Sequence, residues 1–344
     1  AVVKPLYEDT GEYQTWRGFR LLGIDGSKII LPDSASVRDT FGSFRVSNEP
    51  GKTLKQYPLA IASVLYDVLN GVALDSQLAH STSYEVDLAK THLPHTRTQD
   101  LLLCDRNYAS YIWLATLLQQ GRDFVIRCSK SSFGTARQLF LNTGAPSMIV
   151  TLTPHDKKRQ KALNLGLPLQ IKVRFVRVTL NTGETEVLVS SLLDETLYTP
   201  LDFKILYHLR WGVETFYSIL KSRLTLENFS GKTAEAVRQD FYSSVFLSGM
   251  ESILTRDAQR LLDEKTKPDT YDRNVNRMVS FNALKHQAFE LLCSNEDLDS
   301  ILEKLTQLFL NKPIYLQKER ERPRKKLRDE QRIGYHLRKK KICY

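Results

Sequence analysis

The chain has 344 residues, 42% of them hydrophobic and 26% charged, which is the composition of a globular protein with one large core or two modest ones. It has no run of 18 apolar residues, so a membrane-spanning helix is excluded, and its net charge of +10 favours a polyanionic partner. The four cysteines lack metal-ligand spacing, so we expect reduced thiols and a cytoplasmic protein. With neither a signal-peptide pattern nor an initial Met, the chain is expected to begin inside a longer reading frame or after processing.

The first third of the chain alternates apolar runs with turns. Asn70-Gly71 is a hairpin signal between two of these runs. A helix is predicted over 84–92, and another over 109–121, closed by Gly121. Strands are predicted, in chain order, over 19–25, 28–32, 57–68, 72–79, 101–105 and 123–129.

The composition of the sequence changes between residues 130 and 197. Polar, Pro-, Gly- and Lys-rich segments surround two strand-like runs, 171–180 and 186–193. The sequence Asn-Thr-Gly at 181–183 predicts a hairpin turn between them. This part does not continue the earlier alternation, and we interpret it as a β-rich insertion.

The last part of the chain is predicted to be helical. A helix starts at Thr199 as N-cap, with Pro200 in its first position and Asp202 completing a capping box. Several more helices follow over 233–310, with a charged loop near 264–274. Residues 318–341 then hold twelve Lys and Arg against four Asp and Glu, a basic tail that either contacts a polyanion or is simply solvated.

The helix around residues 207–221 has two different faces. At 100° per residue, Tyr207, Arg210, Glu214 and Lys221 fall within about 60° of one another, with Trp211 at the margin. A carboxylate among a phenol and two cations suits a site for metal ions and phosphates; the alternative is a solvated face with chance spacing. The opposite face is an apolar, core-facing stripe made of Ile205, Leu209, Val213, Phe216 and Leu220.

Two aspartates occur in matched settings. Asp25 and Asp105 each end a short apolar run, and on neighbouring strands about 4.8 Å apart their carboxylates can share a cation. Glu214, on a helix beside the sheet, can complete a three-carboxylate site for Mg²⁺ or Mn²⁺, with two ions roughly 3.5–4 Å apart. Taken singly, each aspartate is equally typical of a strand-end cap or a turn.

These residues together resemble the DDE transposases of bacterial insertion sequences, and specifically the insertion sequence four family. That family carries Y-x2-R-x3-E-x6-K, the spacing of Tyr207, Arg210, Glu214 and Lys221 here. IDGS at 24–27 is similar to its first-aspartate motif, and CDRNY at 104–108 to its second. The likeness covers about residues 16–228.

The resemblance implies a ribonuclease H-like α/β core, a mixed sheet flanked by helices, with a β-rich insertion before the glutamate and a helical C-terminal region. The 108 residues between Asp105 and Glu214 leave room for that insertion. The expected units are the first part of the core over 1–129, the insertion over 130–197, the catalytic helix over 198–230, the helical region over 231–312 and the basic tail over 313–344.

The resemblance also implies chemistry. Asp25, Asp105 and Glu214 are expected to bind two Mg²⁺ or Mn²⁺ ions, while water and then a freed 3′-hydroxyl attack phosphodiesters in a cut-and-paste reaction. Residues expected to contact DNA phosphates are Tyr207, Arg210 and Lys221, with Arg106, Asn107 and Trp211 as further possible DNA contacts.

The implied partners are double-stranded DNA, as transposon ends and as target, and a second copy of the chain in a DNA-bound homodimer. The implied location is the bacterial cytoplasm, at the nucleoid when the protein acts. Two alternatives stay open: a catalytically inactive, truncated transposase remnant that binds DNA, and a nuclease of the same fold.

Overall fold

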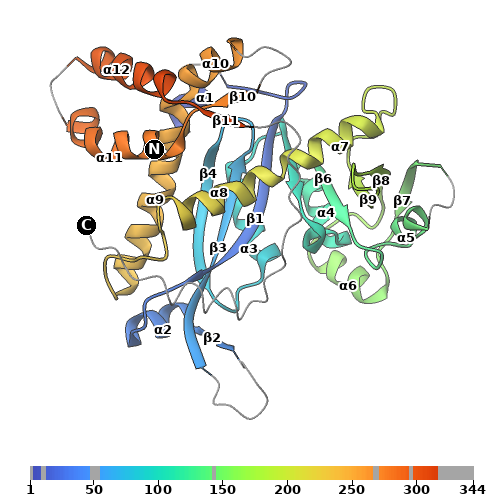
Figure 1. Cartoon of the computed structure of the whole chain (residues 1–344). Helices are drawn as coiled ribbons and strands as arrows, with labels where there is room; N and C mark the ends of the chain where they lie inside the picture. The colour runs from blue at the N-terminus through green and yellow to red at the C-terminus, as the bar shows by residue number, and fades with distance from the viewer. Residues whose placement is uncertain are drawn as a thin grey trace.

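The computed structural model describes residues 3–8, 13–46, 55–141, 145–265, 271–293 and 297–316 (Figure 1). All but the first four residues of the predicted basic tail, 313–344, therefore lie outside the described residues. Within them the fold is mixed α/β: nine strands form one sheet, in the order β2-β3-β1-β5-β6-β9-β8-β7 with β4 paired to β3, and helices flank it. This confirms the predicted fold class.

The centre of the sheet has ribonuclease H-like topology. Strands β1 (Arg20–Ile30), β3 (Lys55–Asp67) and β4 (Val72–His80) are antiparallel neighbours. Strands β5 (Asp100–Cys104) and β6 (Asp123–Cys128) continue the sheet from β1 and run parallel to it. A short strand, β2 (Ser43–Val46), pairs with the first part of β3.

Both faces of the central strands are covered. Alternate residues of β1 and β5, such as Ile24 and Cys104, pack against α3 (Glu85–His92) and α4 (Tyr111–Gln119). The residues between them, such as Leu21 and Leu103, pack against α7 (Pro200–Leu209). A strand that is buried on both faces needs the near-continuous apolar sequence seen here.

Residues 20–30 form one strand, so the prediction of two short strands at 19–25 and 28–32 was wrong. Pairing with β3 runs without interruption from Leu22 to Ile30, through Gly26 and Ser27. Asp25 consequently lies in mid-strand rather than at a strand end. It is nevertheless the first residue of β1 beyond the segment that pairs with β5.

The other predictions for this part were confirmed. The hairpin between β3 and β4 turns at Gly71, which has a φ of 70°, a conformation that glycine adopts without strain. The predicted helices correspond to α3 and α4, and Gly121 follows α4 with a φ of 65°. Two further short helices, α1 (Val3–Glu8) and α2 (Ala35–Phe41), were not predicted.

Residues 130–197 extend the main sheet. The two predicted strands are β8 (Ile171–Thr179) and β9 (Thr185–Ser190), and β9 pairs antiparallel with β6. Strand β7 (Ser147–Leu152) and helices α5 (Gly134–Phe140) and α6 (Asp156–Asn164) were not predicted. Helix α6 is polar on nearly every side and buries only Ala162, so it lacks the apolar stripe that reveals a helix. The unit boundaries given above stay predictions.

The predicted catalytic helix is divided in two. Thr199 and Asp202 form the capping box around Pro200 as expected, but the helix is interrupted at Arg210, between α7 and α8 (Trp211–Ser222). The Arg210 backbone stays in the right-handed helical region, so α8 follows α7 directly across the sheet (Figure 1).

The C-terminal part is helical, as predicted. It contains α9 (Ala234–Leu254), α10 (Arg256–Glu264), α11 (Arg277–Cys293) and α12 (Leu298–Asn311). Strands β10 (Asp272–Asn274) and β11 (Ile314–Leu316), which lie on either side of α11 and α12 in the chain, pair antiparallel as a separate two-stranded sheet. Helices α10 and α12 share a separate apolar cluster. Among the described residues, no helix combines the length and apolar character needed to cross a bilayer.

Candidate active site

The two aspartates are neighbours at the carboxyl end of β5. The last paired residues of β1 and β5 are Ile24 and Cys104, so Asp25 and Asp105 come next on adjacent strands. The backbone of Asp105 is still extended. Because side chains alternate along a strand, both aspartates project on the face of Leu21 and Leu103, which α7 covers.

Helix α8 brings Glu214 to this edge by packing closely on β1. A Cβ atom at Gly23 would lie 2.2 Å from Cγ2 of Val213, so only glycine permits this approach of helix to strand. One turn further on, the Tyr217 hydroxyl lies 3.1 Å from both the Asp25 and the Ala62 carbonyl oxygens, to which it can donate. Strand and helix are thus fixed to each other on either side of Glu214.

A guanidinium group bridges two of the three carboxylates. Arg210 donates from Nη2 to Oε1 of Glu214 at 2.9 Å, and its Nη1 lies 3.8 Å from Oδ2 of Asp25. The Arg210 side chain is 5% exposed, and its Nε makes no hydrogen bond within the described part of the chain. Its position between α7 and α8 places this cation beside the acidic groups.

The site carries more negative charge than Arg210 compensates. Burial raises the pKa of Asp25 to about 7; the Gly26 N–H and Arg210 oppose that rise, and Asp105 and Glu214 add to it. Charge repulsion from both other carboxylates means that the three acids interact electrostatically at one place. A buried carboxyl group with acidic neighbours and a raised pKa is stabilised by binding either a proton or a cation.

The donor set fits a hard divalent cation. Asp25, Asp105 and Glu214 offer only carboxylate oxygens, the ligands preferred by Mg²⁺ and Mn²⁺. As the side chains stand, no three His, Cys, Asp or Glu residues in the described ranges are arranged to hold an ion. Arg210 bridges two of the acids, so binding requires these side chains to rotate toward one another and away from it.

A fourth carboxylate, Glu85, lies at the same edge and was missed from the sequence. The Asn107 side-chain amide donates to Oε2 of Glu85 at 3.2 Å, while the Asn107 backbone N–H donates to Oδ1 of Asp105 at 2.7 Å. A Cβ at Gly26 would lie 2.9 Å from Oε1 of Glu85. Asn107, predicted to contact DNA, thus links two acidic residues; no sequence signal marks Glu85 beyond its place at the start of a helix.

The remaining predicted residues take different positions. Tyr207 is 2% exposed, lies under the Arg210 guanidinium, and its hydroxyl has no hydrogen-bond partner among the described residues. Lys221 donates to Oγ of Ser27 at 2.9 Å and to the Lys28 carbonyl oxygen at 2.6 Å. Trp211 also lies beside Arg210, its ring centre 5.6 Å from the guanidinium carbon. Their predicted DNA contacts stay predictions.

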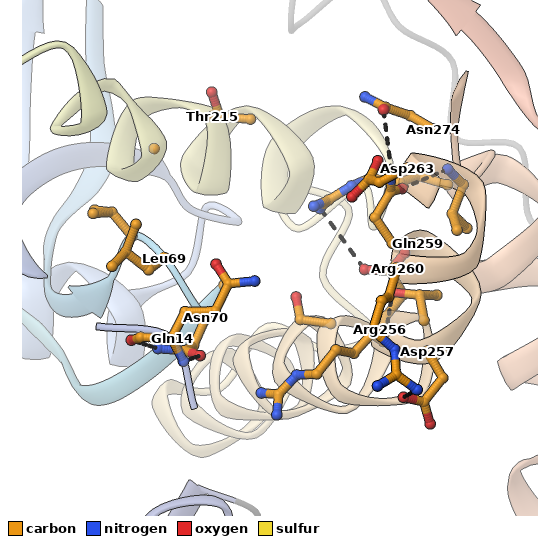
Figure 2. A pocket seen from close by; sticks show the side chains of 18 of the residues that line it. Gln14, Leu69, Asn70, Thr215, Arg256, Asp257, Gln259, Arg260, Asp263 and Asn274 are labelled. Carbon is orange, nitrogen blue, oxygen red and sulfur yellow. Dashed lines mark hydrogen bonds and ion pairs between the residues drawn. The ribbon is translucent and has the colours of Figure 1, made fainter. Parts of the chain in front are cut away.

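The cavity shown in Figure 2 is separate from the three carboxylates. It has a volume of about 810 Å³ and lies between α8, the β3–β4 turn and α10, with Thr215 and Asn70 opposite Arg256 and Arg260 (Figure 2). Its lining carries acidic and basic side chains together and includes none of the predicted catalytic residues. Its size therefore does not identify it as the active site.

Comparison with known proteins relates the chain to one family. Residues 24–248 match the family model described as "Transposase DDE domain", a range that contains Asp25, Asp105 and Glu214. No curated protein matches the chain. Among solved structures it is similar to the piggyBac transposase synaptic complex with hairpin DNA, determined by cryo-electron microscopy, with 12% sequence identity and a TM-score of 0.47. The similarity covers 87% of this chain and 58% of the other, so the chain spans less than two thirds of that protein.

Proposed function

The chain belongs to the DDE transposase family, since the family model covers well over half of it, and we propose that it is an active enzyme that cuts DNA at transposon ends and joins them to target DNA. The observation that carries the proposal is the convergence of Asp25, Asp105 and Glu214 at the carboxyl edge of β5, where burial, with a further contribution from the two acidic neighbours, raises the pKa of Asp25. Divalent metal ions are the cofactors that members of this family generally use.

In the proposed reaction the three carboxylates would hold two Mg²⁺ or Mn²⁺ ions, which would supply positive charge at the reacting phosphate. Asp25 and Asp105 present oxygen ligands from rigid strands, and Glu214 presents them from α8. A water oxygen attacks phosphorus, the bond to the 3′-oxygen breaks, and that oxygen leaves as a hydroxyl. The same hydroxyl later attacks a phosphodiester of the other strand or of target DNA; the new bond to phosphorus replaces the bond to that strand's 3′-oxygen, which leaves as a 3′-hydroxyl with the proton of the attacking group.

The other site residues are proposed to hold the DNA. Arg210 is fixed beside the carboxylates, and Lys221 is held further along β1 at Ser27. Both can bind phosphate oxygens, Arg210 through two parallel N–H groups. The Tyr207 ring packs against the Arg210 guanidinium and helps to position it. The Tyr207 hydroxyl can contact a DNA phosphate only if the guanidinium moves aside. Arg106, Asn107 and Trp211 border the same edge and are proposed as further contacts.

The finer assignment is to the insertion sequence four family, with a cut-and-paste pathway and a homodimer that pairs two DNA ends. The spacing of Tyr207, Arg210, Glu214 and Lys221 supports this assignment. The proposed location is the bacterial cytoplasm, at the nucleoid during transposition.

The test is cleavage of plasmid DNA that carries the genomic flanks of the gene. The wild type is expected to nick this DNA with Mg²⁺ or Mn²⁺ and not with EDTA. Asp25→Asn, Asp105→Asn and Glu214→Gln should each lower the rate by at least about 100-fold while leaving the circular dichroism spectrum unchanged. Asp87→Asn, at a side chain that is 66% exposed on α3, is the matched control and should cut normally.

Full activity of the Glu214→Gln protein would refute the proposed site. Binding without turnover under any metal would instead identify the chain as an inactive DNA-binding remnant. Cleaved products that never join to a second DNA would identify a nuclease of the same fold.

A further inference from the structure

The row of charged residues at the sheet edge continues beyond the two aspartates. Cys104 of β5 pairs with Ile126 of β6, so Arg127 follows Asp105 at the same level of the sheet. Val125 packs in the α7 cluster, and alternation places Arg127 on that face too. Asp25, Asp105 and Arg127 therefore stand side by side on three parallel strands.

A groove of about 550 Å³ opens at this end of the row. Arg106, which directly follows Asp105, lines one part of the groove. Arg127, Ser129 and Lys130, at the end of β6, line another part. Glu184 and Glu186, at the start of the neighbouring strand β9, also line it. The groove thus shares its border with the catalytic edge and leads away from it over β6.

The basic residues in the groove differ in whether their charge is compensated. Arg127 donates from Nη1 to Oε1 of Glu186 at 2.8 Å, so these two charges cancel. Arg106 and Lys130 are exposed, and neither side chain makes a hydrogen bond or ion pair with any residue in the described ranges. Two unengaged cations beside a site for phosphodiester chemistry are suited to binding anions.

We propose that this groove holds the sugar–phosphate backbone of the DNA strand that leaves the catalytic carboxylates, with Arg106 and Lys130 each contacting a phosphate. The proposal rests on the proposed function, because it names the path of the substrate next to that site. DNA is the occupant because the reacting phosphodiester of the proposed function lies at Asp105. Arg106 directly follows Asp105, so the next phosphates of the same strand pass close to it. Contacts of this kind give affinity without sequence specificity.

The experiment measures binding of a mixed-sequence 30-base-pair duplex to the full chain in EDTA by fluorescence anisotropy over a range of salt concentrations. Arg106→Ala combined with Lys130→Ala should weaken binding about tenfold and reduce the slope of log affinity against log salt by about two. The control is Lys157→Ala combined with Lys158→Ala, which removes two exposed lysines from α6, on the opposite face of the sheet, and should bind as the wild type does. Equal affinity and slope for the two double variants would overturn the proposal.

A second measurement needs no variant. Acetylation of lysines by acetic anhydride, followed by mass spectrometry, should show protection of Lys130 by the duplex, while Lys157 and Lys158 react equally with and without DNA. Undiminished acetylation of Lys130 in saturating DNA would also overturn the proposal.

The two proposals fail in distinguishable ways. If the wild type cuts DNA but the Arg106/Lys130 variant binds like its control, the groove proposal alone is wrong. If the variant binds weakly but the wild type cuts DNA with no metal, the groove proposal stands and the proposed function is wrong.

Discussion

Arg210 and Glu214 form a hydrogen-bonded ion pair of 2.9 Å one helical turn apart, and the same guanidinium lies 3.8 Å from Asp25. The pair spans the junction of α7 and α8, where the helix is interrupted. The guanidinium therefore holds together two carboxylates that would otherwise repel each other. A metal ion bound by the same carboxylates must compete with this guanidinium.

Replacing Arg210 should strengthen metal binding in the absence of DNA. In Arg210→Gln the competing cation is gone, and at pH 8 we expect Mn²⁺ to bind about tenfold more tightly, equivalent to roughly 1.4 kcal/mol. Electron paramagnetic resonance of free Mn²⁺ measures this affinity. Arg127→Gln removes the same charge from a residue paired with Glu186 and should have a smaller effect. Unchanged or weaker binding by Arg210→Gln would contradict the competition.

The stability of the metal-free chain should depend on pH through Asp25. Its pKa is raised from 3.8 to about 7 on folding, so the folded chain binds this proton more tightly than the unfolded chain. The resulting stabilisation is fully present below about pH 4 and is lost as the pH rises through about 7. The melting temperature of the wild type in EDTA should therefore decrease between pH 5 and pH 8, and in Asp25→Asn this decrease should be smaller. A wild-type curve that matches the variant over this range would show that Asp25 titrates normally.

The close packing of α8 on β1 should be sensitive to a single methyl group. Gly23→Ala places a Cβ atom against Val213, so the helix must shift, at a cost of about 1–3 kcal/mol in the free energy of unfolding, and Glu214 moves with it. The double variant Gly23→Ala/Val213→Ala relieves the clash and should recover part of both stability and DNA cleavage. Urea denaturation and the cleavage assay measure the two effects. No recovery in the double variant would mean that Gly23 matters for another reason.

The central fold could be predicted because its strands carry continuous apolar sequence and its turns carry strong local signals. Asp25 and Asp105 could each be assigned to a strand because each follows such a run, whereas the pairing of the two strands is seen in the structure. The division of residues 20–30 into two strands failed because Gly26-Ser27 has the composition of a turn, whereas pairing with β3 keeps it extended. Helix α6 was missed because it buries so little of its surface.

The three acidic residues singled out from the sequence lie at one edge of the sheet, but their surroundings could not be predicted as well. Helical periodicity placed Tyr207 and Arg210 on one accessible face, but the interruption at Arg210 and packing against the sheet leave Tyr207 almost completely buried. Arg127 reaches the same edge through strand order and register, and Glu85 through the packing of α3 against β1. Such tertiary relationships have no counterpart in local sequence pattern.

The most direct test of the account is a change of metal specificity at Asp105. A thiolate binds Mn²⁺ more readily than Mg²⁺, so Asp105→Cys should abolish DNA cleavage with Mg²⁺ and restore a measurable fraction of it with Mn²⁺. Asp87→Cys is the matched control and should cut with either ion. The account predicts this Mn²⁺-dependent rescue at Asp105; cleavage by Asp105→Cys with Mg²⁺ at the wild-type rate would contradict the claim that this carboxylate binds the catalytic metal.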